Sequence, residues 1–435
     1  MNKPTKRRAK EKVDLLIVNA NELLTLAGTN EKPRTGKQMR ELGIVRKGAL
    51  AIRDGRIVAV GKTSEITRKF RSENLISASG KIVLPGFVDA HTHLVFAGFR
   101  EKEFQMRIEG ASYMEILSAG GGILKTVRET RKASFDKLVD LAIQTLDVML
   151  EHGTTTVEAK SGYGLATKDE LKILEVIRRA NQLHSVDVVP TFLGAHAVPP
   201  EYKNNAAEYV NLIVDEMIPQ VAEKGLAEFC DVFCERGVFN LEQSKRILVA
   251  GKNYRLKPKI HADEMSTCGG AELAAEVGAV SADHLLFASM EGVKAMAEKC
   301  VAAVLLPGAA FSLMMGKFAD ARLMINCGVP VALGTDYNPS CVLENMQLVI
   351  AFACHFMQLT PAEAITAATI NAAHAIGKAH EIGSLEVGKK ADVIILNAPN
   401  HKFLGYHFGV NLVDKVIKNG RVVVDREARR IQLPF

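Results

Sequence analysis

The stretch "KIVLPGFVDAHTHLVFAG", residues 81–98, decides the fold prediction for this chain. An apolar run leads directly into two histidines, His91 and His93, which are separated by a single residue. Side chains two positions apart in an extended chain point to the same side, so both imidazole rings can face one cation. The stretch therefore predicts a buried strand over residues 81–91 that ends at a candidate metal site.

Further apolar runs follow along the chain, separated by helical stretches. They lie at residues 153–160, 186–196, 227–233, 258–264, 279–286, 300–307 and 330–336. The segment "SFDKLVDLAIQTLDVMLEHG" (134–153) is typical of the stretches between them, with a serine at the expected start of a helix and a glycine at its end. Eight strands alternating with helices predict an α/β fold, a (β/α)8 TIM barrel over residues 81–380. A doubly wound parallel sheet is the structural alternative.

The two ends of the chain have a different pattern, with short β-rich runs and tight turns. Asp54-Gly55 and Asn419-Gly420 are both strong hairpin signals. We therefore expect residues 13–80 and 381–435 to form together a small composite β-sandwich domain. The basic segment at residues 1–12 is expected to be a flexible tail.

The composition is that of an ordinary globular protein, with 435 residues and a formal net charge of +6. The seven cysteines are scattered, which is typical of reduced thiols and predicts a cytoplasmic location. The start of the sequence does not resemble a signal peptide, and the longest apolar stretch, residues 301–315, is too short to span a bilayer. The sequence has no basic stripe interleaved with aromatic residues. We expect neither a membrane nor a nucleic acid as partner.

Polar residues gather where the predicted strands end, which is where (β/α)8 barrels carry their active sites. A single histidine beside a strand is more often an ordinary hydrogen-bonding residue than a ligand, but here several strands share the feature. Imidazoles combined with one carboxylate suit zinc or iron rather than calcium or magnesium. No lysine ends the fourth run, so we expect one metal ion rather than two. The residues at these strand ends are His91, His93, His196, His261, Glu264, Asp283, His284 and Asp336.

This arrangement resembles the amidohydrolase superfamily, which has His-x-His on the first barrel strand, histidines on the fifth and sixth, and an aspartate on the eighth. The closing segment at residues 359–396 is also similar to that superfamily. Four stretches, at 95–123, 157–165, 191–202 and 259–264, resemble more specifically the imidazolonepropionase family. Members of that family hydrolyse 4-imidazolone-5-propanoate to N-formimidoyl-L-glutamate, a step of histidine degradation.

The resemblance implies roles for particular residues. The implied metal ligands are His91, His93, His261 and Asp336, holding one Zn²⁺ or Fe²⁺/Fe³⁺ ion per subunit. The implied substrate contacts are Arg100, Tyr163, His196, Glu264 and Asn338, with Tyr113 as a further candidate. After "GTDYNP" the family commonly has a glycine and then a small hydroxyl residue, whereas this chain has Ser340 and Cys341. A backbone contact at Ser340 and a side-chain contact at Cys341 are therefore the least supported.

The expected chemistry is hydrolysis of a cyclic amide by a water molecule that the metal activates. Glu264, His284 and Asp336 are the candidates for moving protons, and which is base and which is acid stays open. His196 is expected to polarise the carbonyl group. Arg100 is expected to pair with the propanoate carboxylate.

Two other functions are compatible with parts of this pattern. A cytosine or guanine deaminase on the same scaffold would use a similar single metal, but its product has no carboxylate tail for Arg100. A non-enzymatic assembly protein with this fold would be expected to lose metal ligands, and every expected ligand is present here. The sequence does not choose between zinc and iron. A homodimer would fit the family.

Overall fold

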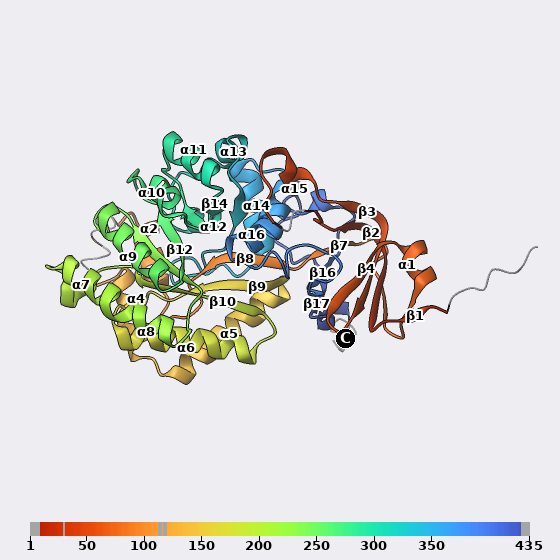
Figure 1. Ribbon diagram of the computed structural model, residues 1–435, viewed down its shortest axis with the longest axis horizontal. Helices are drawn as coiled ribbons and strands as arrows, with labels where there is room; N and C mark the ends of the chain where they lie inside the picture. The colour runs from red at the N-terminus through yellow and green to blue at the C-terminus, as the bar shows by residue number, and fades with distance from the viewer. Residues whose placement is uncertain (1–8, 29–30, 112–114, 116–119, 428–435) are drawn as a thin grey trace, which may run out of the picture.

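Eight parallel strands form a closed barrel in the middle of the chain (Figure 1). The computed structural model describes residues 9–28, 31–111, 115 and 120–427. The strands are β8 (Phe87–Thr92), β9 (Thr154–Lys160), β10 (Asp187–Ala195), β11 (Phe229–Cys234), β12 (Lys257–Ala262), β13 (Ser281–His284), β14 (Ala302–Leu305) and β15 (Val331–Leu333). Each one pairs with the next in sequence order.

The barrel closes between its first and last strands. Thr92 bridges to Tyr337, just beyond β15, and the Asp336 amide donates to the His91 carbonyl oxygen at 3.0 Å. A doubly wound sheet would reverse its strand order partway, and this sheet does not. The predicted (β/α)8 barrel is therefore confirmed.

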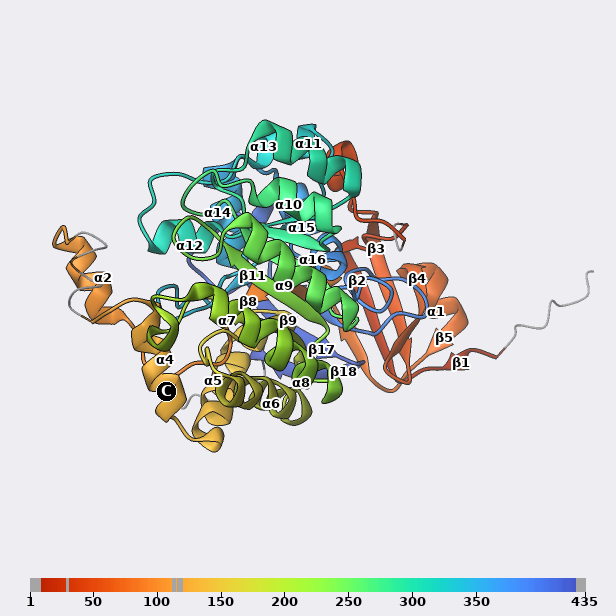
Figure 2. The same ribbon diagram turned by 60° about the vertical axis from the view of Figure 1, so that its left-hand side comes forward.

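Helices cover the outside of the barrel, as the crossover rule requires. α5 begins as the sequence predicts, since the Ser134 side chain accepts from the Lys137 amide at 3.2 Å. Figure 2 shows α2 standing out from the barrel. The helices are α2 (Glu101–Ile108), α4 (Ile123–Lys132), α5 (Phe135–Glu151), α6 (Thr167–Leu183), α7 (Ala206–Leu212), η3 (Ile213–Met217), α8 (Ile218–Glu223), α9 (Leu241–Asn253), α10 (Gly270–Val277), α11 (Met290–Lys299), α12 (Pro307–Ser312), α13 (Ala321–Asn326), α14 (Met346–Met357), α15 (Pro361–Ala367) and α16 (Ile370–Ala375), with short turns η1 (Gly36–Arg40), η2 (Pro200–Tyr202) and η4 (His401–Phe403).

The two ends of the chain build a second sheet beside the barrel, at the right in Figure 1. Its order is β18-β17-β16-β7-β2-β3-β4, with β6 against β2. The strands are β2 (Leu15–Leu24), β3 (Ile44–Arg53), β4 (Arg56–Lys62), β6 (Leu75–Ser77), β7 (Ile82–Pro85), β16 (Val393–Leu396), β17 (Val413–Lys418) and β18 (Arg421–Asp425). The predicted β-sandwich made of both chain ends is confirmed.

Both predicted hairpin turns occur in this sheet. Asp54 and Gly55 join β3 to β4 with φ of 51° and 73°, and Asn419 and Gly420 join β17 to β18 with φ of 48° and 76°. Two consecutive residues with positive φ match the twist of the flanking strands, which explains the Asp-Gly and Asn-Gly sequences.

Alternate residues of β2 face two different apolar clusters. Leu15 and Ile17 pack into the interior of the sandwich, whereas Leu16 and Val18 face the opposite side, where Ile66 of α1 (Thr63–Lys69) covers them. This alternation follows from the two-residue period of a strand.

The strand predicted over residues 81–91 is in fact two strands. β7 lies in the small sheet and β8 opens the barrel, with Gly86 between them. A side chain at Gly86 would collide with Thr155, so glycine lets the chain pass close to β9. β7 therefore extends the small sheet past residue 80, the boundary that the sequence predicts.

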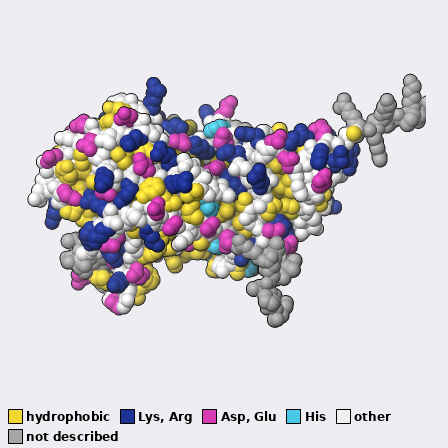
Figure 3. Space-filling view, turned by 90° about the horizontal axis from the view of Figure 1, so that it is seen from below, with side chains coloured by type: hydrophobic (Ala, Val, Ile, Leu, Met, Phe, Trp, Pro, Cys, Tyr) yellow, Lys and Arg dark blue, Asp and Glu magenta, His cyan; other side chains and the backbone are white. Residues whose placement is uncertain are grey.

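The N-terminal segment is only partly described. The prediction of a flexible tail falls mostly on residues 1–8, which lie outside the described residues. β1 (Glu11–Lys12) pairs with β5 (Phe70–Arg71), so the last two residues of the predicted tail belong to a strand. Among the described residues, no helix is both long and apolar enough to cross a membrane. Figure 3 shows acidic and basic side chains interspersed over one face of the molecule.

Candidate active site

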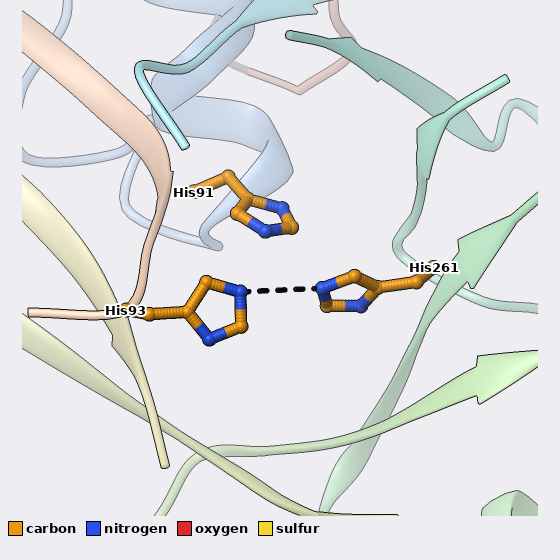
Figure 4. A group of neighbouring side chains, drawn as sticks. All are labelled: His91, His93 and His261. Carbon is orange, nitrogen blue, oxygen red and sulfur yellow. Dashed lines mark hydrogen bonds between the residues drawn. The ribbon is translucent and has the colours of Figure 1, made fainter. Parts of the chain in front are cut away.

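The carboxyl ends of the barrel strands bring the predicted ligands together. His93 Nε2 lies 3.5 Å from His261 Nε2 and 3.7 Å from Asp336 Oδ1, and His91 Nε2 lies 3.5 Å from the same Asp336 oxygen. The rings of His91, His93 and His261 surround one point (Figure 4). Among the described residues, two sets of ligand atoms each lie within 4.8 Å of one another: His91, His93 and His261, and His91, His284 and Asp336.

The hydrogen bonds at this cluster fit a bound cation. His91 Nδ1 donates to Asp283 Oδ2 at 2.7 Å, so the lone pair of His91 is on Nε2 and faces the cluster. His91 Nε2 and Asp336 Oδ1 are buried and have no hydrogen-bond partner among the residues that the structure describes. Such atoms are costly in a protein interior, and a metal ion would supply the missing interaction.

The charge states also suit metal binding. Burial holds the pKa of His91, His93 and His261 well below 6.5, so the rings are neutral, as a ligating imidazole must be. Burial raises the pKa of Asp336 to about 7. A bound cation would favour the carboxylate form of Asp336.

A layer of charged side chains lies beneath the cluster inside the barrel. Lys160 Nζ donates to Glu158 and Asp231 at 2.8 Å each and lies 3.2 Å from Asp283 Oδ2. Burial alone would lower the pKa of Lys160, but these carboxylates outweigh it and raise the pKa. Because its ammonium group is occupied by three carboxylates, Lys160 does not serve as a bridge between two metals.

A cavity of about 520 Å³ opens above the cluster. It is lined by most of the predicted site residues, which come from the loops after several different strands. These residues are His93, Arg100, Tyr163, His196, His261, Glu264, His284, Asp336, Asn338 and Ser340. Tyr113, a further predicted substrate contact, lies outside the described residues.

Arg100 reaches the cavity from the N-terminal end of α2, and a buried partner holds it there. Its Nε donates to Glu103 Oε2 at 2.8 Å, and an Nη lies 2.6 Å from the same oxygen. Glu103 also accepts from the Gly122 amide at 3.2 Å. The Arg100 side chain is thus fixed in direction by a carboxylate that is itself tied to the glycine-rich loop.

His196 and Tyr163 lie side by side in the cavity, with ring centroids 5.2 Å apart. The His196 ring stacks on His93, with centroids 4.7 Å apart, and its Nδ1 donates to the Gly162 carbonyl oxygen at 3.0 Å. Gly162 has φ of 111°, and a Cβ there would lie 2.8 Å from His196 Nδ1, which explains the glycine in "KSGYG".

The protonation of His196 changes the role expected for it. Burial lowers its pKa to about 4, so the ring is neutral near pH 7. Since a carbonyl oxygen can only accept, the single ring proton is on Nδ1 and Nε2 carries a lone pair. This geometry suits an acceptor for an N–H group and does not suit the expected polarisation of a carbonyl.

Glu264 lines the cavity on the loop after β12, with one oxygen 3.7 Å from His284 Nδ1. Burial, reinforced by the charges of Asp336 and Glu235, raises the pKa of Glu264 to about 8. Glu235 also accepts from the Met265 amide at 2.8 Å and so fixes the loop. Burial lowers the pKa of His284 to about 4, which leaves it neutral.

The turn after Asp336 corrects one expected contact. Cys341 does not line the cavity, because its thiol points inward to Ser312 Oγ (3.5 Å) and the Thr335 carbonyl (3.7 Å). Ser340 does line the cavity, and its buried Oγ has no hydrogen-bond partner in the described part of the chain. Asn338 accepts from the amides of both residues, so its side chain mainly holds the turn.

Several residues at this site escaped the sequence analysis. Glu170 accepts from the amides of Gly162, Gly164 and Leu165 and fixes the loop that carries Tyr163. Asp231, the partner of Lys160, was also missed. The one available signal was a charged residue within an apolar run, as in "FCDVFC", because a buried charge is costly unless it is paired.

Comparisons with known proteins show the family of this chain. Residues 82–423 match the model of the amidohydrolase family, and residues 48–71 match that of the imidazolonepropionase-like composite domain of bacteria. The chain is 56% identical to the imidazolonepropionase of Geobacillus kaustophilus, with 94% of this chain and 98% of that protein covered. It is 52% identical to the imidazolonepropionase of Alkaliphilus metalliredigens, with 95% and 99% covered.

A solved structure shares the fold at much lower identity. Guanine deaminase from E. coli superposes with a TM-score of 0.73 at 15% identity, with 94% of this chain and 99% of that chain covered. This likeness shows the fold alone, whereas the full-length relatives show the family. The chain belongs to the imidazolonepropionase family, whose members are hydrolases of the metal-dependent amidohydrolase family.

Proposed function

We propose that this chain hydrolyses the cyclic amide C–N bond of 4-imidazolone-5-propanoate to give N-formimidoyl-L-glutamate. The observation that carries the proposal is that one cavity is lined both by Arg100 and by His93, His261 and Asp336 of the cluster. The cluster suits hydrolysis, and the guanidinium group suits a substrate with a carboxylate tail. A deaminase acting on a nucleobase would have no use for that cation.

In this proposal one zinc or iron ion would be held by four residues, His91, His93, His261 and Asp336. When bound, the ion supplies Lewis-acid activation of the attacking water and of the amide carbonyl. Zinc and iron both accept three imidazoles and one carboxylate, so the choice depends on which metal is available.

Proton movement is assigned to the carboxyl groups at the cavity floor. Asp336 takes a proton from water as the oxygen attacks the ring carbonyl carbon. Glu264, held in its protonated form by burial, gives a proton to the ring nitrogen as the C–N bond breaks. His284, which is neutral, lies 3.7 Å from Glu264 and orients it.

The remaining cavity residues position the substrate. Arg100 donates to the propanoate carboxylate, with Glu103 fixing its direction. His196 accepts a ring N–H through Nε2. Burial raises the pKa of Tyr163, so its hydroxyl stays protonated and can donate. Ser340 Oγ, which has no hydrogen-bond partner among the described residues, offers one further contact.

We also propose that the enzyme is a cytoplasmic homodimer. A cytoplasmic location implies reduced thiols, and all seven cysteines, which lie among the described residues, are free. Sedimentation equilibrium of the purified protein tests the dimer, and a single species at monomer mass would contradict it.

The activity is tested by incubating the purified protein with imidazolone propanoate and following the loss of its ultraviolet absorbance, with and without a chelator. We expect turnover that the chelator abolishes and that added zinc or iron restores. Arg100→Ala should reduce turnover strongly. Turnover that is unchanged by this substitution would contradict the substrate assignment.

A further inference from the structure

One lysine links two of the histidines of the cluster from below. Lys160 ends β9 and is fully buried. Its Nζ contacts Asp231 at 2.8 Å and Asp283 at 3.2 Å. Those carboxylates come from β11 and β13, so a single ammonium group joins three different barrel strands.

Each of these carboxylates leads on to one metal-site histidine. Asp283 Oδ2 accepts from His91 Nδ1 at 2.7 Å. Asp231 Oδ2 lies 3.1 Å from His261 Nδ1, within ion-pair distance but, among the described residues, without the geometry of a hydrogen bond. The oxygen atoms that contact Lys160 are the same ones that face the histidines, so the lysine, the two carboxylates and the two rings form one branched chain of contacts.

The cost of this arrangement argues that it serves more than packing. TIM barrel interiors are usually filled with branched apolar side chains. Replacing a buried ion pair with apolar residues is often neutral or stabilising, so stability alone gives little reason to keep one. Residues that hydrogen-bond to the second nitrogen of a ligating histidine, in contrast, set its tautomer and direction.

We propose that Lys160 is a positioning residue for the metal. Its ammonium group holds Asp231 and Asp283 in place, and these carboxylates keep Nε2 of His261 and His91 directed at the ion. The inference rests on the metal site of the proposed function, but it concerns metal binding and is independent of the substrate.

A second buried lysine provides a matched control. Lys259, on β12, is also fully buried. It contacts Glu158 at 3.4 Å and the carbonyl oxygens of Ala90 and Ala375 at 3.5 and 3.4 Å. Among the described residues it forms no hydrogen bond or ion pair with Asp231 or Asp283. Removing it deletes the same charge from the same interior without cutting the path to the histidines.

The test compares Lys160→Met with Lys259→Met in the full-length protein. Zinc affinity of each metal-free variant is measured by competition with a chromogenic chelator, and the cobalt-loaded proteins are compared by visible absorption. We expect Lys160→Met to weaken zinc binding by about 10- to 100-fold and to alter the cobalt spectrum. Lys259→Met should leave both close to wild type, even if both variants unfold at lower temperature.

Equal zinc affinities and matching cobalt spectra for the two variants would overturn the proposal. If a methionine variant does not fold, the same comparison is made with Lys160→Gln and Lys259→Gln, which keep a polar group. A wild-type protein that fails to bind zinc or iron would instead contradict the proposed function, so the two failures can be told apart.

Discussion

The small sheet and the barrel are both built from strands, but their interiors are filled in opposite ways. The interior of the small β-sandwich contains apolar side chains such as Leu50, Ile52 and Ile395. Inside the barrel, below the histidines, lie the fully buried Lys160 and Lys259 with their carboxylate partners. An apolar interior stabilises the fold through buried area, whereas a charged one holds specific atoms in specific directions.

Among the substitutions that test this contrast, removal of a cluster histidine should have the largest effect on activity. His261→Ala should lower kcat by at least about 10³-fold, because Lewis-acid activation is worth several kcal/mol. Steady-state assays with added zinc measure this. His407→Ala, at an exposed histidine outside the cavity, is the control and should behave like wild type. A His261 variant that retains wild-type kcat would remove the cluster from the mechanism.

The second largest effect on activity is expected for Arg100→Ala. A charge-assisted hydrogen bond contributes about 1.5–3 kcal/mol, so kcat/KM should fall by roughly 10- to 100-fold. Arg128, which donates to the Gly120 carbonyl and does not line the cavity, provides the control variant Arg128→Ala. A similar loss in both variants would indicate damage to this loop region rather than loss of a substrate contact.

Glu103→Gln should produce a smaller change of the same kind. The glutamine keeps the size of the side chain but cannot form an ion pair, so Arg100 becomes less firmly directed. We expect KM to rise several-fold with little change in kcat. A fall in kcat at unchanged KM would assign Glu103 to the chemical step and contradict the positioning role.

The pH dependence of stability probes the charged interior without substrate. Burial raises the pKa of Glu264 to about 8, while an unfolded glutamate titrates near 4.3. Between about pH 4 and pH 8 the folded metal-free protein binds more protons than the unfolded chain, so its stability falls as the pH rises. Glu264→Gln should make that slope shallower in thermal unfolding experiments. Glu223→Gln, at an exposed position, should leave it unchanged.

The smallest effect on the site is expected from the apolar interior. Leu50→Ala should cost about 2–5 kcal/mol of unfolding free energy. Zinc affinity and kcat should stay close to wild type at temperatures where the variant is folded. A large loss of zinc affinity would show that the two interiors are coupled and that the contrast drawn between them is too simple.

Much of the fold could be predicted from the sequence because its signals are local. Apolar runs mark the strands, and Asp54-Gly55 and Asn419-Gly420 mark tight turns whose backbone requirement depends only on those residues. The break at Gly86 was missed because it depends on Thr155, which comes from a different strand. No local pattern shows that a chain must pass that close to its neighbour.

The site was predictable to a lesser degree. The histidines and Asp336 could be grouped because each ends a strand of one barrel, and the structure brings them together. The inward turn of the Cys341 thiol, the proton on His196 Nδ1 and the pairing of Lys160 with Asp283 depend on contacts between residues far apart in the chain. Such contacts set direction and charge, which residue types alone do not encode.

The central claim is that the protein hydrolyses the ring of imidazolone propanoate in this cavity, with one molecule of water. The most direct measurement is mass spectrometry of the product formed by the zinc-loaded enzyme in ¹⁸O-labelled water. We expect N-formimidoyl-L-glutamate that carries one ¹⁸O atom in its new carboxylate, with no ammonia released. Release of ammonia from the substrate, or no turnover by protein that has bound its metal, would contradict the account.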